Sequence, residues 1–283
     1  VREKLENIKR FYDPVLKAYQ EEPLNIEQYL SILGNFHTKV SALIIDNSFI
    51  KNNFNQNNIL FEGAQGALLD LDHGSYPFVT SSNTISSNIM IGSGLQVDYQ
   101  TVGIFKAYAT RVGNGPFPSE LFDEIGDYIA ETGVEFGTVT KRKRRCGWLD
   151  LVLLKQSVDI CGIHGLALTK LDVLDEFEKI NICISYNFNG KKYNYLPPII
   201  SSTDHLKTEY IELDGWNEST RGCRNYDELP RNAKKIEFID AFVKYINNLM
   251  SKRITFIELY KSHATGIKRV KRITVNIIIK GIV

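Results

Sequence analysis

Apolar residues return every three or four positions near the start of the chain and form short unbroken runs further on. The helical spacing over residues 26–47 predicts an amphipathic helix, and residues 2–20 predict another. The run at 59–61 predicts a short buried strand that ends at Gly63, and the segment 165–172 predicts a buried strand followed by a loop. The chain therefore mixes helix-type and strand-type patterns.

The order of these patterns predicts the fold class. Residues 119–131 and 148–160 predict helices, whereas 103–111 fits a strand or a helix equally well. Helices that alternate with apolar strands favour an α/β fold with a central, mostly parallel sheet flanked by helices. No repeat or clean linker interrupts the pattern, so we expect a single domain over residues 1–283.

Two polar loops follow the predicted strands. Residues 63–101 are rich in Gly, Ser and Asn, and loops of this length inside a compact domain are usually functional. Lys170 lies where the later strand ends. Because ligands bind at the carboxyl ends of parallel strands, we expect both loops to line one crevice.

The overall charge argues against a partner that is recognised by a global field. The chain has 34 basic and 33 acidic residues and a formal net charge of +1, so neither nucleic acid nor a membrane is favoured and anion binding must be local. No apolar run reaches the roughly 18 residues that a membrane span needs. The four cysteines form no C-x-x-C pair, which argues against a zinc site and suits a reducing cytosol.

The densest charge is the run KRKRR at residues 141–145. Adjacent cations repel one another, and arginine offers bidentate hydrogen bonds to carboxylates and phosphates, so this run and the hydroxyl-bearing loop before it suit a doubly anionic small substrate. A solvated or nuclear-targeting patch is the alternative. Nucleic-acid binding through the run is a further one, although the net charge gives it no support.

The tetrapeptide TKLD at 169–172 is similar to the N-K-x-D loop with which GTP-binding proteins read guanine. A carboxylate at Asp172 can accept hydrogen bonds from both N1–H and the N2 amino group of guanine, an edge that adenine lacks. The stem of Lys170 can lie over the base. An ordinary turn at a strand end is the alternative, because four residues are a weak pattern.

The segment DLDH at 70–73 allows a metal site or a turn. Carboxylate and imidazole ligands suit divalent ions, but Asp residues beside glycine also form turns, and we favour the turn. Gln65 lies among small residues that let a ligand approach the backbone, and its amide can donate to an oxygen that gains charge. A polar turn without a ligand is the alternative at Gln65.

Together these segments resemble the adenylosuccinate synthetase family. The motifs that carry the resemblance are LFEGAQGALLDLDHGSYPFVTSSN at 60–83, KAYATRVGNGPFPSEL at 106–121, EFGTVTKRKRRCGWLDL at 135–151, LTKLDVLD at 168–175 and GWNESTRGCRNYDELP at 215–230. The resemblance implies a cytoplasmic, homodimeric ligase that makes adenylosuccinate from IMP and L-aspartate, with GTP as substrate and Mg²⁺ as cofactor. In the family, GTP phosphorylates the purine 6-oxygen and the aspartate amine then displaces the phosphate, which is the first committed step from IMP to AMP.

The resemblance also implies site residues, with Gln65 as the catalytic contact to the 6-oxygen. The residues implied to bind IMP are Gln65, Thr80, Val112 and Arg142. Those implied to bind L-aspartate are Thr138, Val139, Thr140, Lys141, Arg142, Lys143 and Arg144. Those implied to bind GTP are Arg144, Lys170, Leu171 and Asp172, together with Ala264, Thr265 and Gly266 in a blurred match to the family's closing segment.

The chain departs from the family pattern in several places. The glycine-rich loop G-D-E-G-K-G-K, which carries the family's catalytic aspartate and a magnesium ligand, does not occur, so no residue here is implied to bind metal. Val139 and Lys141 replace an expected Thr and Gly, and the basic tail from about residue 261 is atypical. We therefore expect a carboxyl-terminal fragment, incomplete relative to the family's single domain, that has no ligase turnover by itself. A catalytically inactive nucleotide-binding fragment or degenerate homologue is the alternative.

Overall fold

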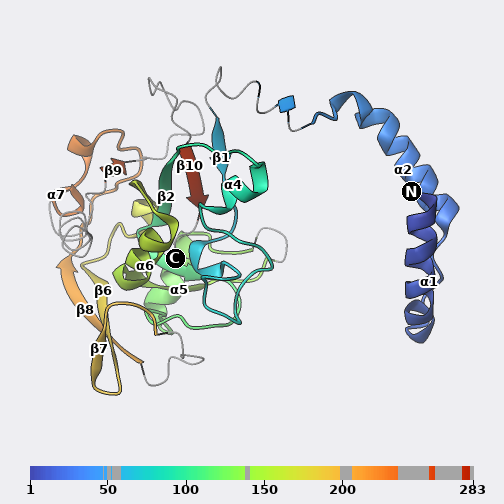
Figure 1. The fold of residues 1–283 in the computed structure, drawn as a ribbon. Helices are drawn as coiled ribbons and strands as arrows, with labels where there is room; N and C mark the ends of the chain where they lie inside the picture. The colour runs from blue at the N-terminus through green and yellow to red at the C-terminus, as the bar shows by residue number, and fades with distance from the viewer. Residues whose placement is uncertain are drawn as a thin grey trace. The chain divides into compact units, whose positions relative to one another are not determined.

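The computed structural model describes residues 1–46, 48–49, 52, 59–137, 141–197, 206–234, 255–258 and 276–280. The chain divides into two compact units, residues 1–55 and 56–283, and each is described by itself (Figure 1). The expectation of a single domain over 1–283 stays a prediction. In the described part of the chain, no helix is long and apolar enough to cross a membrane.

The first unit contains two helices that pack on each other. Helices α1 (Arg2–Ala18) and α2 (Ile26–Val40) confirm the two predicted helices. The side chain of Asn25 caps α2 by accepting a hydrogen bond from the backbone N–H of Gln28. Helix α2 ends before residue 47 because the chain tightens into a 3-10 turn at Ser41–Leu43, although the apolar spacing continues.

The second unit contains a parallel sheet in the order β1-β10-β2-β5-β9. Its strands are β1 (Leu60–Glu62), β2 (Gln100–Lys106), β5 (Gly165–Thr169), β9 (Thr255–Glu258) and β10 (Asn276–Lys280). All neighbouring strands in it are parallel, which confirms the predicted α/β fold. Strand β10, near the end of the chain, lies between β1 and β2 (Figure 1). The predicted strand at 59–61 exists as β1, but Leu60 is 49% exposed because β1 is an edge strand.

The second unit also contains a mixed sheet, which was not predicted. Groups of its strands alternate along the chain with those of the parallel sheet. Its strands are β3 (Tyr108–Arg111), β4 (Arg145–Asp150), β6 (Lys179–Phe188), β7 (Lys191–Tyr193) and β8 (Leu206–Asp214). Strand β4 pairs antiparallel with β3 and parallel with β6, and β6 pairs antiparallel with β7 and β8. The undecided segment 103–111 contains the end of β2 and all of β3. Two strands of different sheets therefore follow each other there, separated only by Ala107.

Two of the helices described in the second unit begin at an aspartate cap. The described helices are α4 (Asn88–Ser93), α5 (Glu124–Thr132), α6 (Leu151–Cys161) and the short α7 (Arg231–Lys234). The helices predicted at 119–131 and 148–160 both exist but start later than expected. Asp123 caps α5 and Asp150 caps α6, and β4 occupies the residues before Leu151. Helix α5 packs on β4 and α6 packs on β6, which closes the main core.

Asp150 is fully buried between β4 and α6. Its carboxylate accepts hydrogen bonds from the backbone N–H groups of Val152 and Leu153, each at 3.0 Å, and from the hydroxyl of Tyr186 at 2.7 Å. Burial raises the pKa of Asp150 to about 6, although these hydrogen bonds favour the charged form. The ionised carboxylate therefore costs stability at neutral pH.

We expect Asp150→Asn to flatten part of the pH dependence of unfolding. Because the native pKa lies above the ordinary value of 3.8, the folded state holds the proton more tightly, and this group's contribution to stability falls as pH rises from about 4 to about 6. Asparagine does not ionise. The fall of about 2–3 kcal/mol in the free energy of unfolding that the wild type shows over that pH range should therefore be absent from denaturant melts of the variant. Asp123→Asn, which changes the exposed cap of α5, is the matched control. Equal pH slopes for wild type and Asp150→Asn would contradict the prediction.

Candidate functional site

A cavity of about 460 Å³ lies at the carboxyl end of β1. The residues that line it come from β1 and the loop after it, from the segment 82–86 and from α4. Gln65 is exposed in the wall of this cavity and has a left-handed backbone, with φ of +59°. Such a conformation is uncommon for residues other than glycine and clusters at functional sites. The wall combines apolar surface with the polar side chains of Gln65, Asn83 and Asn88, which can hydrogen-bond to a ligand.

Asp70 holds the loops around this cavity together. Its fully buried carboxylate accepts hydrogen bonds at 2.5 to 3.2 Å from the backbone N–H groups of Asp72, His73, Thr84 and Ile85. The hydroxyl of Thr84 in turn donates to the carbonyl of Gly66 at 2.8 Å. Burial opposes the charge on Asp70, but the backbone donors together lower its pKa. The segments 72–73 and 83–85 are thus tied to one anion, and Thr84 links them to Gly66, directly after Gln65.

These contacts do not fit the metal alternative at 70–73. Both oxygens of Asp70 already accept backbone hydrogen bonds, and Asp72 accepts one from the amide of Asn83 at 2.6 Å. Among the described residues, no group of three or more His, Cys, Asp or Glu side chains could hold a metal ion. The described residues therefore offer no ligand set for the Mg²⁺ that the resemblance implies.

Two of the three other positions implied to hold IMP, Thr80 and Val112, are joined through Arg111. Its guanidinium donates to the hydroxyl of Ser75 at 2.9 Å and to the carbonyl of Phe78 at 3.1 Å, so it fixes the loop that leads to Thr80. Val112 follows Arg111 directly and is 60% exposed. Burial lowers the pKa of Arg111 to about 10, with a further contribution from a neighbouring arginine. Thr80 and Val112 are thus tied to a common framework.

Three members of the cation run form ion pairs with carboxylates of the described residues. Its ion pairs are Lys143 with Asp127, Arg144 with Glu135, and Arg145 with Glu120. These carboxylates relieve part of the repulsion for which the sequence suggested an anionic ligand. Lys141 and Arg142 are exposed, and the carbonyl of Arg142 accepts a hydrogen bond from Gly137 at 2.8 Å, which closes the base of the loop. Thr138, Val139 and Thr140 lie outside the described residues.

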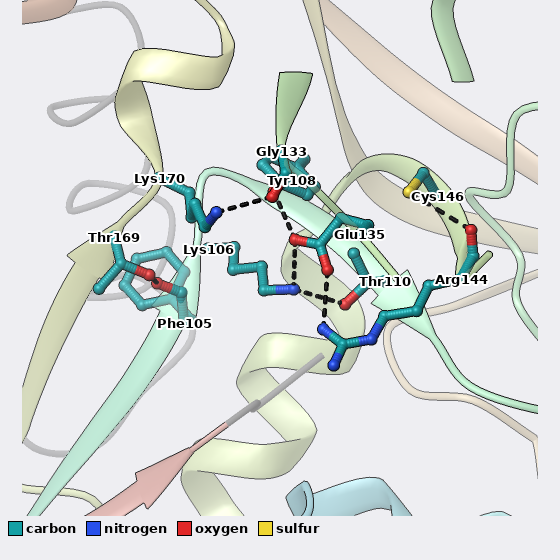
Figure 2. A network of polar contacts seen from close by, with 10 residues as sticks. All are labelled: Phe105, Lys106, Tyr108, Thr110, Gly133, Glu135, Arg144, Cys146, Thr169 and Lys170. Atoms are coloured by element: carbon teal, nitrogen blue, oxygen red, sulfur yellow. Dashed lines mark hydrogen bonds and ion pairs between the residues drawn. The ribbon is translucent and has the colours of Figure 1, made fainter. Parts of the chain in front are cut away.

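Glu135 is the centre of a polar network near this loop (Figure 2). Its side chain is 2% exposed and accepts hydrogen bonds from Tyr108 at 2.6 Å, Lys106 at 2.7 Å and Arg144 at 2.8 Å. Burial opposes its charge, but Lys106, Tyr108 and Arg144 together lower its pKa. Sequence reasoning did not single out Glu135, Lys106 or Tyr108, although the motifs at 106–121 and 135–151 contain them.

The segment implied to read guanine follows β5. Lys170 has a left-handed backbone, with φ of +62°, and opens a 3-10 turn that begins with Leu171. Its ammonium donates to the carbonyl of Gly133 at 2.7 Å. The side chain of Asp172 is 18% exposed and lies 3.6 Å from the guanidinium of Arg221. Ala264, Thr265 and Gly266 lie outside the described residues.

The structure brings some of these residues together and separates others. Arg144 and Lys170 both contact the short segment 133–135 (Figure 2). The described lining of the Gln65 cavity includes none of residues 170–172, and β10 and β2 lie between β1 and β5 in the sheet. A crevice shared by the Gln65 and Lys170 loops stays a prediction.

Similarity to known proteins assigns this chain to a family. An adenylosuccinate synthetase family model matches residues 1–264. The chain belongs to the adenylosuccinate synthetase family. The adenylosuccinate synthetase of Neisseria meningitidis serogroup C (strain 053442) is 44% identical over 264 residues, which cover 91% of this chain and 60% of the relative. That of Clostridium botulinum (strain Eklund 17B / Type B) is 44% identical over 255 residues, which cover 87% and 60%.

A solved structure agrees with this family assignment. The structure of fully ligated adenylosuccinate synthetase from Plasmodium falciparum is 36% identical in sequence, with a TM-score of 0.80, and the match covers 91% of this chain and 61% of that one. The chain thus spans about 60% of the length of the curated adenylosuccinate synthetases that it matches. Strand β10 follows the last residue of the family match.

Proposed function

We propose that this chain forms the part of an adenylosuccinate synthetase that contacts IMP, L-aspartate and the guanine of GTP. The whole protein joins IMP and L-aspartate and releases adenylosuccinate, GDP and phosphate. The observation that carries the proposal is the cavity at Gln65, because the motif that builds it also carries the family resemblance. Its position at the end of a parallel strand and the mixture of apolar and polar side chains in its wall support a nucleotide ligand.

The proposed chemistry gives each subsite a distinct task. The γ-phosphoryl group of GTP passes to the purine 6-oxygen, and the amine of aspartate then attacks C6 while the C6–O bond breaks and phosphate leaves. Gln65 donates its amide hydrogen to the 6-oxygen as that atom gains charge. Arg142 and Arg144 bind the carboxylates of aspartate, and Asp172 accepts hydrogen bonds from the N–H groups of guanine. The remaining proposed contacts are Thr80 and Val112 to IMP, Thr138, Val139, Thr140, Lys141 and Lys143 to aspartate, and Lys170, Leu171, Ala264, Thr265 and Gly266 to GTP.

The family resemblance supports three further proposals about the whole protein. It is a homodimer, it works in the cytoplasm, and it uses Mg²⁺. No residue of this chain is proposed as a ligand of that ion, and no step is assigned to it.

Titrating IMP onto the 283-residue chain in a calorimeter tests the proposal. We expect saturable binding that Gln65→Ala weakens about tenfold, because one hydrogen bond from the amide is lost. Gln28→Ala, which removes the same side chain from α2 in the first unit, is the matched control and should bind as wild type does. No IMP binding by the wild-type chain, or equal affinities for wild type and Gln65→Ala, would contradict the proposal.

Adding the amino-terminal part of a bacterial relative distinguishes the two forms of this proposal. A functional fragment should then show GTP-dependent formation of adenylosuccinate, whereas an inactive nucleotide-binding homologue should bind IMP and GTP without turnover. Chromatographic detection of adenylosuccinate in the mixture provides the measurement.

A further inference from the structure

Glu135 lies in a segment with little freedom to move. After α5, its backbone N–H donates to the carbonyl of Ala130 at 2.8 Å, and its carbonyl accepts from the backbone N–H of Arg144 at 2.8 Å. A side chain added at Gly133 would meet the hydroxyl oxygen of Tyr108 at 2.4 Å and the carbonyl of Ile129 at 2.7 Å. This close packing fixes where the Glu135 carboxylate and the Gly133 carbonyl lie.

These two acceptors bind cations from the proposed aspartate loop and from the proposed guanine segment (Figure 2). The carboxylate of Glu135 binds the guanidinium of Arg144 at 2.8 Å, in the proposed aspartate loop. The carbonyl of Gly133, two residues earlier, binds the ammonium of Lys170 at 2.7 Å, in the proposed guanine segment. One rigid segment is therefore in contact with both subsites.

Among the described residues, two cations pair with the single buried carboxylate of Glu135. These are Lys106 and Arg144, whose side chains are only 18% and 31% exposed, and the ammonium of Lys170 binds the carbonyl of Gly133 in the same segment. Burial lowers the pKa of Lys106, Glu135 raises it, and Arg144 and Lys170 lower it further. In addition, the Nε of Arg144 is buried and has no hydrogen-bond partner among the described residues. An anionic ligand balances an excess of cations, and it accepts hydrogen bonds from donors that have no other partner.

We infer that Glu135 is a positioning residue that orients Arg144 and couples the aspartate loop to the guanine segment. This inference rests on the proposed function, because it takes the two ligands from there. Glu135 holds the Nη1 of Arg144, so it fixes the direction in which this guanidinium meets an anionic ligand. L-aspartate that binds Arg144 therefore affects Lys170 through Glu135 and Gly133. GTP that binds at Lys170 affects Arg144 through the same contacts.

Glu135→Gln tests the coupling, because it keeps the size of the side chain and removes the charge. For the wild-type chain, we expect L-aspartate to change the affinity for GTP at least fivefold, as measured by calorimetric titration with and without the amino acid. In Glu135→Gln, GTP should bind about tenfold more weakly and aspartate should no longer change its affinity. Glu120→Gln removes the carboxylate that pairs with Arg145, beside the same loop, and should keep the coupling. Equal coupling in Glu135→Gln and Glu120→Gln would overturn the inference.

A second measurement needs no ligand. The Nε–H signal of Arg144 in ¹⁵N NMR spectra, assigned by its loss in Arg144→Lys, should exchange with water at least tenfold faster in Glu135→Gln than in wild type or Glu120→Gln. An unchanged Arg144 signal in Glu135→Gln overturns the positioning role whether or not GTP binds. If the wild-type chain bound neither GTP nor IMP, the proposed function would fail, and this signal would still decide the role of Glu135.

Discussion

Replacing Asp70 with alanine should destabilise the second unit by about 3–5 kcal/mol, because it leaves several buried N–H groups without acceptors. The backbone donors of Thr84 and Ile85 are buried and lose their contacts to the Asp70 carboxylate at 2.5 and 3.2 Å. A loss of this size corresponds to a fall of about 10 °C in Tm. Because Asp70 ties the loops beside Gln65 together, IMP binding should fail in the same variant.

Asp72→Ala is the matched control for this loss. Asp72 is exposed two residues away, and its carboxylate accepts a hydrogen bond from the amide of Asn83. We expect Asp72→Ala to cost less than about 1 kcal/mol, as most exposed substitutions do. Calorimetric melts of wild type and both variants provide the measurement. Stabilities for Asp70→Ala and Asp72→Ala that agree within 1 kcal/mol would show that the buried carboxylate does not hold the cavity together.

Asp172→Ala should weaken GTP binding by between about 100- and 1,000-fold. In the proposed site, one carboxylate accepts hydrogen bonds from both N1–H and N2–H of guanine, and each charge-assisted hydrogen bond is worth about 1.5–3 kcal/mol. Asp172 is suited to this role because its side chain is 18% exposed, in the turn directly after β5. ATP lacks these donors, so the preference for GTP over ATP should disappear together with the affinity.

The control for this prediction addresses the ion pair of Asp172. Arg221→Ala removes the guanidinium that lies 3.6 Å from Asp172 but keeps the carboxylate, and it should change the affinity for GTP less than about threefold. Titrations of GTP and ATP onto all three proteins provide the comparison. An Asp172→Ala protein that binds GTP within threefold of wild type would contradict the assignment of guanine to this segment.

Local patterns in the sequence predicted much of the fold. Apolar spacing located α1, α2 and α5, and apolar runs located β1 and β5, because neighbours three or four residues apart on a helix, or two apart on a strand, face the same surroundings. Helix starts were placed several residues early, since a single carboxylate cap at Asp123 or Asp150 decides where α5 and α6 begin. The fold class and the family therefore followed from residues close together in the chain.

Motifs also located the candidate residues, but not how they are used. Gln65, Thr80 and Asp172 were found because they stand in motifs typical of the family. The turn favoured at 70–73 did not reveal that both oxygens of Asp70 accept hydrogen bonds from backbone donors, which argues against a metal at this residue. Nor did the run KRKRR show which of its cations are paired within the chain.

Taken by itself, the sequence determined the helices, the strand-end loops and the family, because these depend on short-range spacing and on motif order. Only the tertiary structure decided which strands are neighbours, since β10 reaches its place between β1 and β2 from far along the chain. It also decided the role of Glu135, whose partners Lys106 and Arg144 stand 29 and 9 residues away. Such contacts depend on how β2, β3 and β4 are brought together, and no local periodicity encodes that pairing.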